Sequence, residues 1–170
     1  MKPKAISPER VQSNKILKRW CADVKGDVLS IGSGGDIDKQ GGKYREYFTS
    51  ATSYTTSDIE PSMGTDIVMD ARDMPLDDER YDAVFCSGVL EHVDEYHLVV
   101  KEVCRVLKTG GVFLLGVPFK QPIHRAPEDY WRFTEHGLRW MLRKFAVKEI
   151  QPLGDPEFPF GYWAKAVKVA

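Results

Sequence analysis

The sequence predicts an α/β domain: a doubly wound, mostly parallel sheet of seven strands with helices on both faces and an antiparallel last strand. Short apolar runs alternate with segments of helical periodicity, which is the pattern of a parallel sheet covered on both faces. The first run, at residues 28–31, breaks directly into Gly32, Gly34 and Gly35. The length of 170 residues, with 42% apolar and 29% charged, suits one ordinary globular domain.

Composition narrows the class of function. The net charge of −1 gives no electrostatic reason to expect a nucleic-acid partner, so we expect none, although a local basic patch stays open. No apolar run could span a bilayer, and residues 1–4 do not lead into a signal peptide, so we expect a cytoplasmic protein without membrane insertion. The scattered Cys21, Cys86 and Cys104 fit reduced thiols. Neither they nor the four histidines have the spacing of a metal site, so no metal is expected.

The elements are predicted in order along the chain. A helix begins after Ser7, whose side chain can cap it, and runs to about Cys21, with Pro8 at its first position. A short irregular helix is expected at residues 44–48. Apolar or β-branched runs predict the seven strands, at residues 28–31, 54–57, 66–69, 81–86, 112–117, 147–151 and 162–169.

Two more helices connect the later strands. Asp94 is expected to cap the first of them, whose apolar face extends over residues 98–107. Gly110 or Gly111 is expected to end that helix in the left-handed position. Thr134 is the predicted cap of the second helix.

The glycine-rich turn after the first strand is the first candidate site. Nucleotides bind at such turns, at the carboxyl ends of strands where an open α/β sheet changes direction. A glycine-rich loop alone is equally consistent with a plain surface turn. Asp58, at the end of the second strand, can accept both hydroxyls of a ribose, although a lone acid there is more often a turn or cap residue.

Several stretches together resemble the class I S-adenosylmethionine-dependent methyltransferases, which have a Rossmann-like fold. The glycine loop resembles the first motif of that family, and Asp58 resembles the acid after its second strand. Asp70–Ala71 resembles the pair that contacts adenine. The stretches Val89–Val93 and Arg105–Gly111 resemble signatures of the small-molecule branch, in the right order and spacing.

The resemblance covers residues 26–118, and residues 124–134 resemble a subset of uncharacterised bacterial members. It implies one methyltransferase-like domain over residues 1–170, with an N-terminal helix at 1–25, a cofactor-binding half at 26–118 and a substrate-side half at 119–170. It implies S-adenosylmethionine as the cofactor. The residues implied to bind it are Gly32, Ser33, Gly34, Asp36, Asp58, Ile59, Asp70, Ala71, Ser87 and Gly88.

The activity implied is methyl transfer to a small molecule, a sugar or another metabolite, by in-line displacement at the sulfonium methyl. His92 and His124 are the candidate general bases, because histidine titrates near physiological pH. For His92 a structural role is the stronger alternative, because within the signature it can be hydrogen-bonded at the helix start. Asp129, Tyr130 and Arg132 are candidate substrate ligands, although the aromatic residues around them can instead pack the loop onto the sheet. A second copy or a partner subunit could complete the lid over a substrate.

Two positions depart from the family pattern. Ser30 stands where the family has an acid that helps to hold the amine of the cofactor, and Asp36 replaces the third glycine of the motif. We hypothesise that Asp36 partly replaces the missing carboxylate. The departures leave open a non-catalytic S-adenosylmethionine-binding or scaffold protein.

Two other readings fit less well. A nicotinamide dehydrogenase needs G-x-G-x-x-G running into a helix, and here Ile37 stands at the third glycine. Nucleobase and protein-amide methyltransferases resemble this pattern but carry an Asn/Asp-Pro-Pro-aromatic motif after the fourth strand. This chain has Cys86–Val89 at that place.

Overall fold

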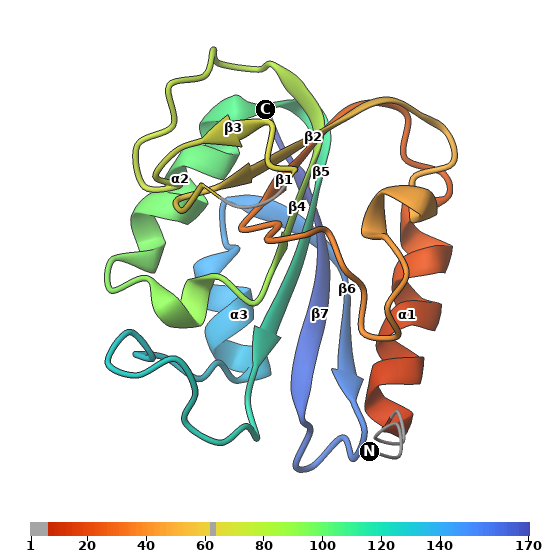
Figure 1. Ribbon diagram of the computed structural model, residues 1–170, viewed down its shortest axis with the longest axis vertical. Helices are drawn as coiled ribbons and strands as arrows, with labels where there is room; N and C mark the ends of the chain where they lie inside the picture. The colour runs from red at the N-terminus through yellow and green to blue at the C-terminus, as the bar shows by residue number, and fades with distance from the viewer. Residues whose placement is uncertain (1–6, 62–63) are drawn as a thin grey trace.

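A computed structural model describes residues 7–61 and 64–170, so the expectation about residues 1–4 lies outside the described residues. One seven-stranded sheet has the order β3-β2-β1-β4-β5-β7-β6 (Figure 1). Its strands are β1 (Gly26–Ile31), β2 (Ala51–Asp58), β3 (Ile67–Val68), β4 (Tyr81–Ser87), β5 (Leu107–Pro118), β6 (Phe145–Leu153) and β7 (Gly161–Lys168). Only β7 runs antiparallel to its neighbours, β5 and β6, so the predicted fold class is confirmed.

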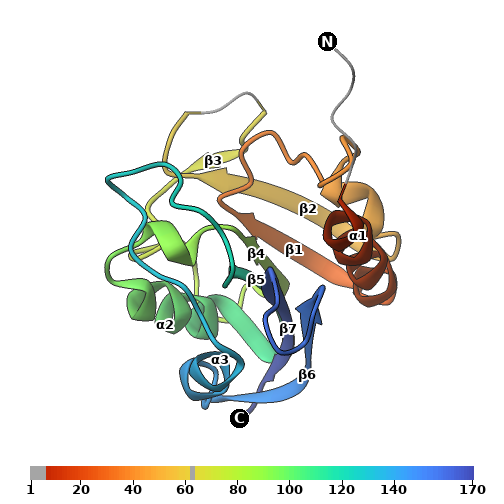
Figure 2. The ribbon, with the colours of Figure 1, turned by 90° about the horizontal axis from the view of Figure 1, so that it is seen from below.

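Helices cover both faces of the sheet (Figure 2). The helix α1 (Pro8–Cys21) lies on one face with the 3-10 turn η1 (Tyr44–Tyr47). The helices α2 (Tyr96–Val106) and α3 (Glu135–Met141) lie on the other, and a second 3-10 turn, η2 (Leu90–His92), precedes α2. Each face therefore has its own apolar core, which removes apolar side chains of both sheet faces from water.

Local signals place two of the helices as predicted. The Ser7 side chain accepts a hydrogen bond from the Arg10 backbone N–H at the start of α1. The Thr134 hydroxyl accepts one from the Gly137 N–H at the start of α3. These bonds satisfy amide groups that have no partner within the first turn. Trp163 on β7 donates to the Ser13 hydroxyl over 2.8 Å, which fixes α1 on the sheet.

The predicted bounds of α2 are wrong. Asp94 does not cap the helix, because its carboxylate pairs with Arg72 and accepts the N–H of the adjacent Glu95. The helix ends at Val106 and not at the glycines, because Leu107 turns to extended backbone and is fully buried beside Tyr81 on β4. Gly110 does adopt positive φ, in the irregular part of β5.

In the described part of the chain, no helix combines the length and apolar character needed to cross a membrane.

The strand order changes direction between β1 and β4, and the carboxyl ends of these strands lie side by side. Ile31 pairs with Ser57 of β2 on one side and with Cys86 of β4 on the other. The loops that follow the three strands therefore start from neighbouring points on one sheet edge, where ligands bind in open α/β folds.

Candidate cofactor site and active-site pocket

The glycine loop needs glycine at two positions, for different reasons. Gly32 has a φ of +61°, and a Cβ built there would lie 2.2 Å from Cγ2 of Val89. The close approach of the loop to the segment after β4 thus requires a residue without a side chain. Gly34 has a φ of +54°, and a Cβ there would meet no described atom within 4 Å. Space is therefore open beside Gly34.

Asp58 joins the glycine loop to the end of β2. One carboxylate oxygen accepts the Gly34 N–H over 3.0 Å, and the other accepts the Glu60 N–H over 3.2 Å. The N–H of Ser33 donates to the Ser57 carbonyl over 3.0 Å. A carboxylate oxygen can accept two hydrogen bonds, so both oxygens of Asp58 retain acceptor capacity for a diol.

The predicted adenine residues lie next along this edge. Ile59 is 60% exposed directly after Asp58. Arg72 occupies both oxygens of Asp70 and also reaches Asp94 over 3.0 Å. Arg72 holds the pKa of Asp70 below its usual range. Asp70 therefore belongs to an ion-pair network, which leaves the half-buried Ala71 beside it as an apolar neighbour for a ligand.

Asp36 is turned into the protein. It is 4% exposed and accepts hydrogen bonds from the backbone and side chain of Arg45 and from the Tyr54 hydroxyl. Asp38 likewise accepts the Gly42 N–H and the Tyr47 hydroxyl. The two acids stabilise the irregular segment between the glycine loop and η1. These contacts give Asp36 a structural use, and its replacement of the acid missing at Ser30 stays a hypothesis.

A pocket of about 340 Å³ opens at the carboxyl ends of β4 and β5. Its volume is within the range of small-molecule sites. Ser87, Gly88 and His92 line it from the segment after β4, and His124 lines it from the loop at residues 119–134. Ser13 of α1 lies on its opposite side. The structure therefore brings the two predicted bases together with Ser87 and Gly88. The other predicted cofactor residues, from the glycine loop and the ends of β2 and β3, do not line this pocket.

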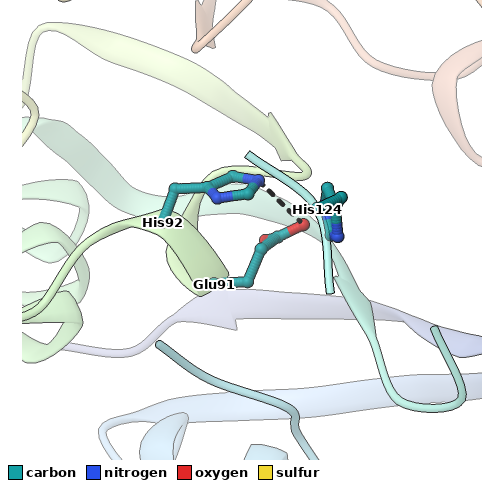
Figure 3. Close-up of side chains that lie close together, drawn as sticks. All are labelled: Glu91, His92 and His124. Atoms are coloured by element: carbon teal, nitrogen blue, oxygen red, sulfur yellow. Dashed lines mark ion pairs between the residues drawn. The ribbon is translucent and has the colours of Figure 1, made fainter. Parts of the chain in front are cut away.

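A third titratable group faces the two histidines, and it was not among the predicted site residues. Glu91 is 3% exposed, and its Oε1 lies 3.9 Å from Nε2 of His92 (Figure 3). Each of three residues, Glu91, His92 and His124, offers one atom that could bind a metal ion. These three atoms lie within 4.8 Å of one another. Oε2 of Glu91 has no hydrogen-bond partner among the described residues. Burial raises the pKa of Glu91.

The predicted substrate residues mostly hold the loop together. Arg132 donates to both oxygens of Asp129, over 2.6 and 2.9 Å, and to the Pro122 carbonyl. Asp129 also accepts the His124 N–H over 2.7 Å. Arg132 holds the pKa of Asp129 well below its usual range. Tyr130 donates its N–H to the Glu91 carbonyl and leaves its side chain 49% exposed. Asp129 and Arg132 thus position His124, and their substrate contacts stay a prediction.

The residue range 39–115 matches the protein family described as the methyltransferase domain. A search of curated proteins found no match. Among solved structures, the putative methyltransferase of Haloferax volcanii in complex with the Trm112 activator has a TM-score of 0.76 at 19% identity. The match covers 95% of this chain and 90% of that one.

A second similar structure is the 1,6-didemethyltoxoflavin-N1-methyltransferase of Burkholderia thailandensis with bound S-adenosylhomocysteine. Its TM-score is 0.72 at 17% identity, over 100% of this chain and 94% of that one. The [4+2]-cyclase SpnF has a TM-score of 0.71 at 16% identity, over 94% of this chain and 83% of that one. S-adenosylmethionine, the cofactor predicted from the sequence, is named for a similar methyltransferase structure from Aquifex aeolicus, and its product S-adenosylhomocysteine is bound in the Burkholderia structure. The chain has the fold of S-adenosylmethionine-dependent methyltransferases, and its residues 39–115 match the family described as the methyltransferase domain.

Proposed function

We propose that the protein transfers a methyl group from S-adenosylmethionine to a small polar molecule, by in-line displacement at the sulfonium methyl. One observation carries this proposal. The glycine loop is hydrogen-bonded to Asp58 at the end of β2. At Gly32 it approaches Val89, next to Gly88, which lines the pocket of about 340 Å³ at the ends of β4 and β5.

The residues of this edge fit the cofactor. Asp58 retains acceptor capacity toward the two ribose hydroxyls, and the exposed Ile59 offers an apolar surface to the adenine. The open space beside Gly34 admits the methionine part, and Ser87 and Gly88 line the pocket into which the methyl would point. When bound, S-adenosylmethionine supplies a methyl carbon already activated by its sulfonium.

The chain's own task is to orient the acceptor and exclude water. The helix α1 and the loop at residues 119–134 enclose the pocket from two sides. Its lining includes charged and polar side chains, among them Arg10, Lys39, Gln121 and Arg125. This lining favours a polar acceptor, such as a sugar or another polar metabolite, over an apolar one. We expect the reaction in the cytoplasm.

A partner could complete the enclosure. The Haloferax structure is a complex with an activator protein, so a second chain on this fold has a precedent. We propose a second copy or a partner subunit as the cover for the open side of the pocket.

Calorimetric titration with S-adenosylmethionine, S-adenosylhomocysteine and NAD tests the cofactor. We expect micromolar binding of the first two and no binding of NAD. Asp58→Ala should weaken both by at least about tenfold, because a hydrogen-bonded charged group contributes roughly 1.5–3 kcal/mol. Asp155→Ala is the matched control, because Asp155 also accepts the N–H two residues ahead of it but lies in the turn between β6 and β7 and not at the end of β2.

The second candidate function, a non-catalytic binding protein, is favoured by Ser30 at the place of the family's acid. Incubation with methyl-labelled cofactor and fractionated metabolite extracts separates the two. Label transferred to a small molecule supports the methyltransferase. Cofactor binding without any transfer supports the binding protein, and no binding of either methionine nucleoside contradicts both.

A further inference from the structure

Glu91 is a buried carboxylate that the fold does not satisfy. It lies in η2, where its backbone carbonyl accepts the N–H groups of Tyr130 and Trp131 and so binds the loop at residues 119–134. Its side chain is 4% exposed, lines the pocket, and leaves Oε2 without a partner among the described residues. A buried carboxylate oxygen without a hydrogen-bond partner is costly, so its retention points to a ligand that the protein itself does not provide.

The two histidines are oriented toward this carboxylate. Nδ1 of His92 lies 2.5 Å from the Glu128 carbonyl, and Nδ1 of His124 lies 3.2 Å from the Pro122 carbonyl. In the tautomer whose Nδ1 donates to the carbonyl, Nε2 of each neutral ring keeps its lone pair for a metal ion. Metal-binding histidines are held in this way, with the second ring nitrogen donating to a carbonyl or carboxylate.

The two rings come from segments distant in the sequence, yet their centroids lie 4.8 Å apart at an angle of 85°. Asp129 supports the arrangement, because it accepts the His124 N–H and lies 3.6 Å from Nδ1 of that ring. Arg132 holds Asp129 in place. The loop thus has its own set of contacts that keep His124 beside Glu91 and His92.

We propose that Glu91, His92 and His124 bind a divalent first-row transition-metal ion, whose remaining positions take a hydroxyl oxygen of the methyl acceptor. Two imidazoles and one carboxylate are a donor set of catalytic ions such as Zn²⁺, with further positions open to water or substrate. The separations within 4.8 Å allow one ion to reach all three groups after small side-chain movements. The role of the ion rests on the proposed function.

The ion gives the histidines a different task from the general base predicted from the sequence. A divalent ion lowers the pKa of a bound hydroxyl, so the hydroxyl loses its proton to solvent water before transfer. The oxygen then forms a bond to the methyl carbon as the carbon–sulfur bond breaks, and the electron pair of that bond stays on sulfur. The products are the methyl ether, S-adenosylhomocysteine and one proton. The acceptor class is therefore a hydroxylated small molecule.

Cations of the protein face the same pocket. Lys39, Arg10 and Arg125 line it, and Lys39 interacts electrostatically with Glu91. A shift of the Lys39 ammonium onto Oε2 would satisfy Glu91 without any metal. The test therefore measures metal binding directly, in the wild type and in Glu91 variants, and does not depend on activity alone.

The experiment titrates the chelator-treated full chain with Mn²⁺, by calorimetry and by electron paramagnetic resonance, and with Zn²⁺ by calorimetry. We expect one ion per chain. Glu91→Gln and His124→Asn should each weaken binding by at least about tenfold, since loss of supporting residues alone has effects of this size. Glu95→Gln and His136→Asn are matched controls at exposed positions outside the pocket, and they should bind as the wild type does. Binding of S-adenosylhomocysteine by each variant shows that it is folded.

Acetohydroxamate, a small oxygen-donor chelator, probes the open positions and should change the spectrum of bound Mn²⁺. An unchanged spectrum would overturn the acceptor assignment. Absence of metal binding, or equal binding by the two site variants and the controls, would overturn the site. If S-adenosylhomocysteine still binds in that case, the proposed function survives. Metal binding without cofactor binding would support the site and contradict the proposed function.

Discussion

Glu91 and Glu102 are two buried glutamates on neighbouring elements, but only the carboxylate of Glu102 has hydrogen-bond partners for both oxygens among the described residues. Glu102 on α2 is 9% exposed and accepts from the Arg105 guanidinium through both oxygens, and also from the Met74 N–H. Arg105 holds the pKa of Glu102 below its usual range. Glu91 is 3% exposed, faces two histidines and keeps Oε2 unpartnered among the described residues, and burial raises its pKa.

The difference between the two glutamates distinguishes a structural role from a functional role within one fold. Glu102 anchors the turn before β4 to α2 with groups that the fold provides. Glu91 is buried at least as fully but lines the pocket, and its Oε2 has no partner among the described residues, which the proposed ion would supply. A buried acid that the fold fully satisfies is explained by stability, and one that it does not satisfy calls for a ligand.

The largest expected effect is on the satisfied glutamate. Glu102→Ala should lower the free energy of unfolding by roughly 3 kcal/mol, because it leaves the Arg105 charge and the Met74 N–H without their partner. Glu91→Gln should lower it by less than about 1 kcal/mol without metal, because the change removes an unpaired buried charge. Urea unfolding at pH 7 with a chelator measures both. Equal losses of unfolding free energy in the two variants would contradict the difference between the two glutamates.

Mn²⁺ should stabilise the Glu91 variant less than the Glu102 variant. At an ion concentration about 100 times the dissociation constant, the wild type should gain about 2.7 kcal/mol, since the ion binds only the folded state. Glu91→Gln should gain at most about 1.4 kcal/mol, since its binding is at least about tenfold weaker, whereas Glu102→Ala should gain as much as the wild type. The same urea titrations, repeated with Mn²⁺, give the result. A gain in Glu91→Gln equal to that of the wild type would contradict the assignment of Glu91 as a ligand.

A smaller effect is expected from the support of His124. Asp129→Asn should weaken Mn²⁺ binding by about tenfold, because it removes the carboxylate that holds the His124 backbone and faces its ring. Cofactor affinity should stay within about twofold, because Asp129 does not line the pocket. Calorimetry with Mn²⁺ and with S-adenosylhomocysteine checks both, with Asp155→Asn as the control. Unchanged Mn²⁺ affinity would remove Asp129 from the account.

The smallest effect is the pH dependence of the satisfied pair. The pKa of Glu102 is lower in the folded protein than the value of about 4.3 for an unfolded chain. Its contribution is therefore fully present above about pH 4.3 and is lost as the pH falls through the folded value. The stability difference between the wild type and Glu102→Gln should be constant from pH 5 to 7 and shrink below pH 4. Urea unfolding over this range shows it, and a difference that grows toward low pH would have the wrong sign.

Much of the fold could be predicted because its signals are local. The caps at Ser7 and Thr134 act within one helical turn, and the buried strands are continuous apolar runs. The bounds of α2 were mispredicted because they depend on distant partners. Asp94 is drawn to Arg72, and Leu107 leaves the helix to be buried beside Tyr81.

In the candidate site, too, features set by the strand order were predictable and features set by distant contacts were not. The glycine loop and Asp58 follow two strands that meet at one sheet edge, so their proximity was predictable from the order of strands. Glu91 was seen only as part of a family signature. Its importance depends on the loop at residues 119–134, which folds back and places His124 beside it. The charge of Glu91 between two apolar neighbours, Leu90 and the partly buried Val93, was the available signal.

The most direct test is a crystal structure of the protein with Mn²⁺ and S-adenosylhomocysteine, with anomalous data collected at the manganese edge. We expect one anomalous peak at the centre of Glu91, His92 and His124, with Oε2 of Glu91 as a ligand and the sulfur of the nucleoside facing the same pocket. An empty site at saturating Mn²⁺, with the Lys39 ammonium on Oε2 instead, would contradict it.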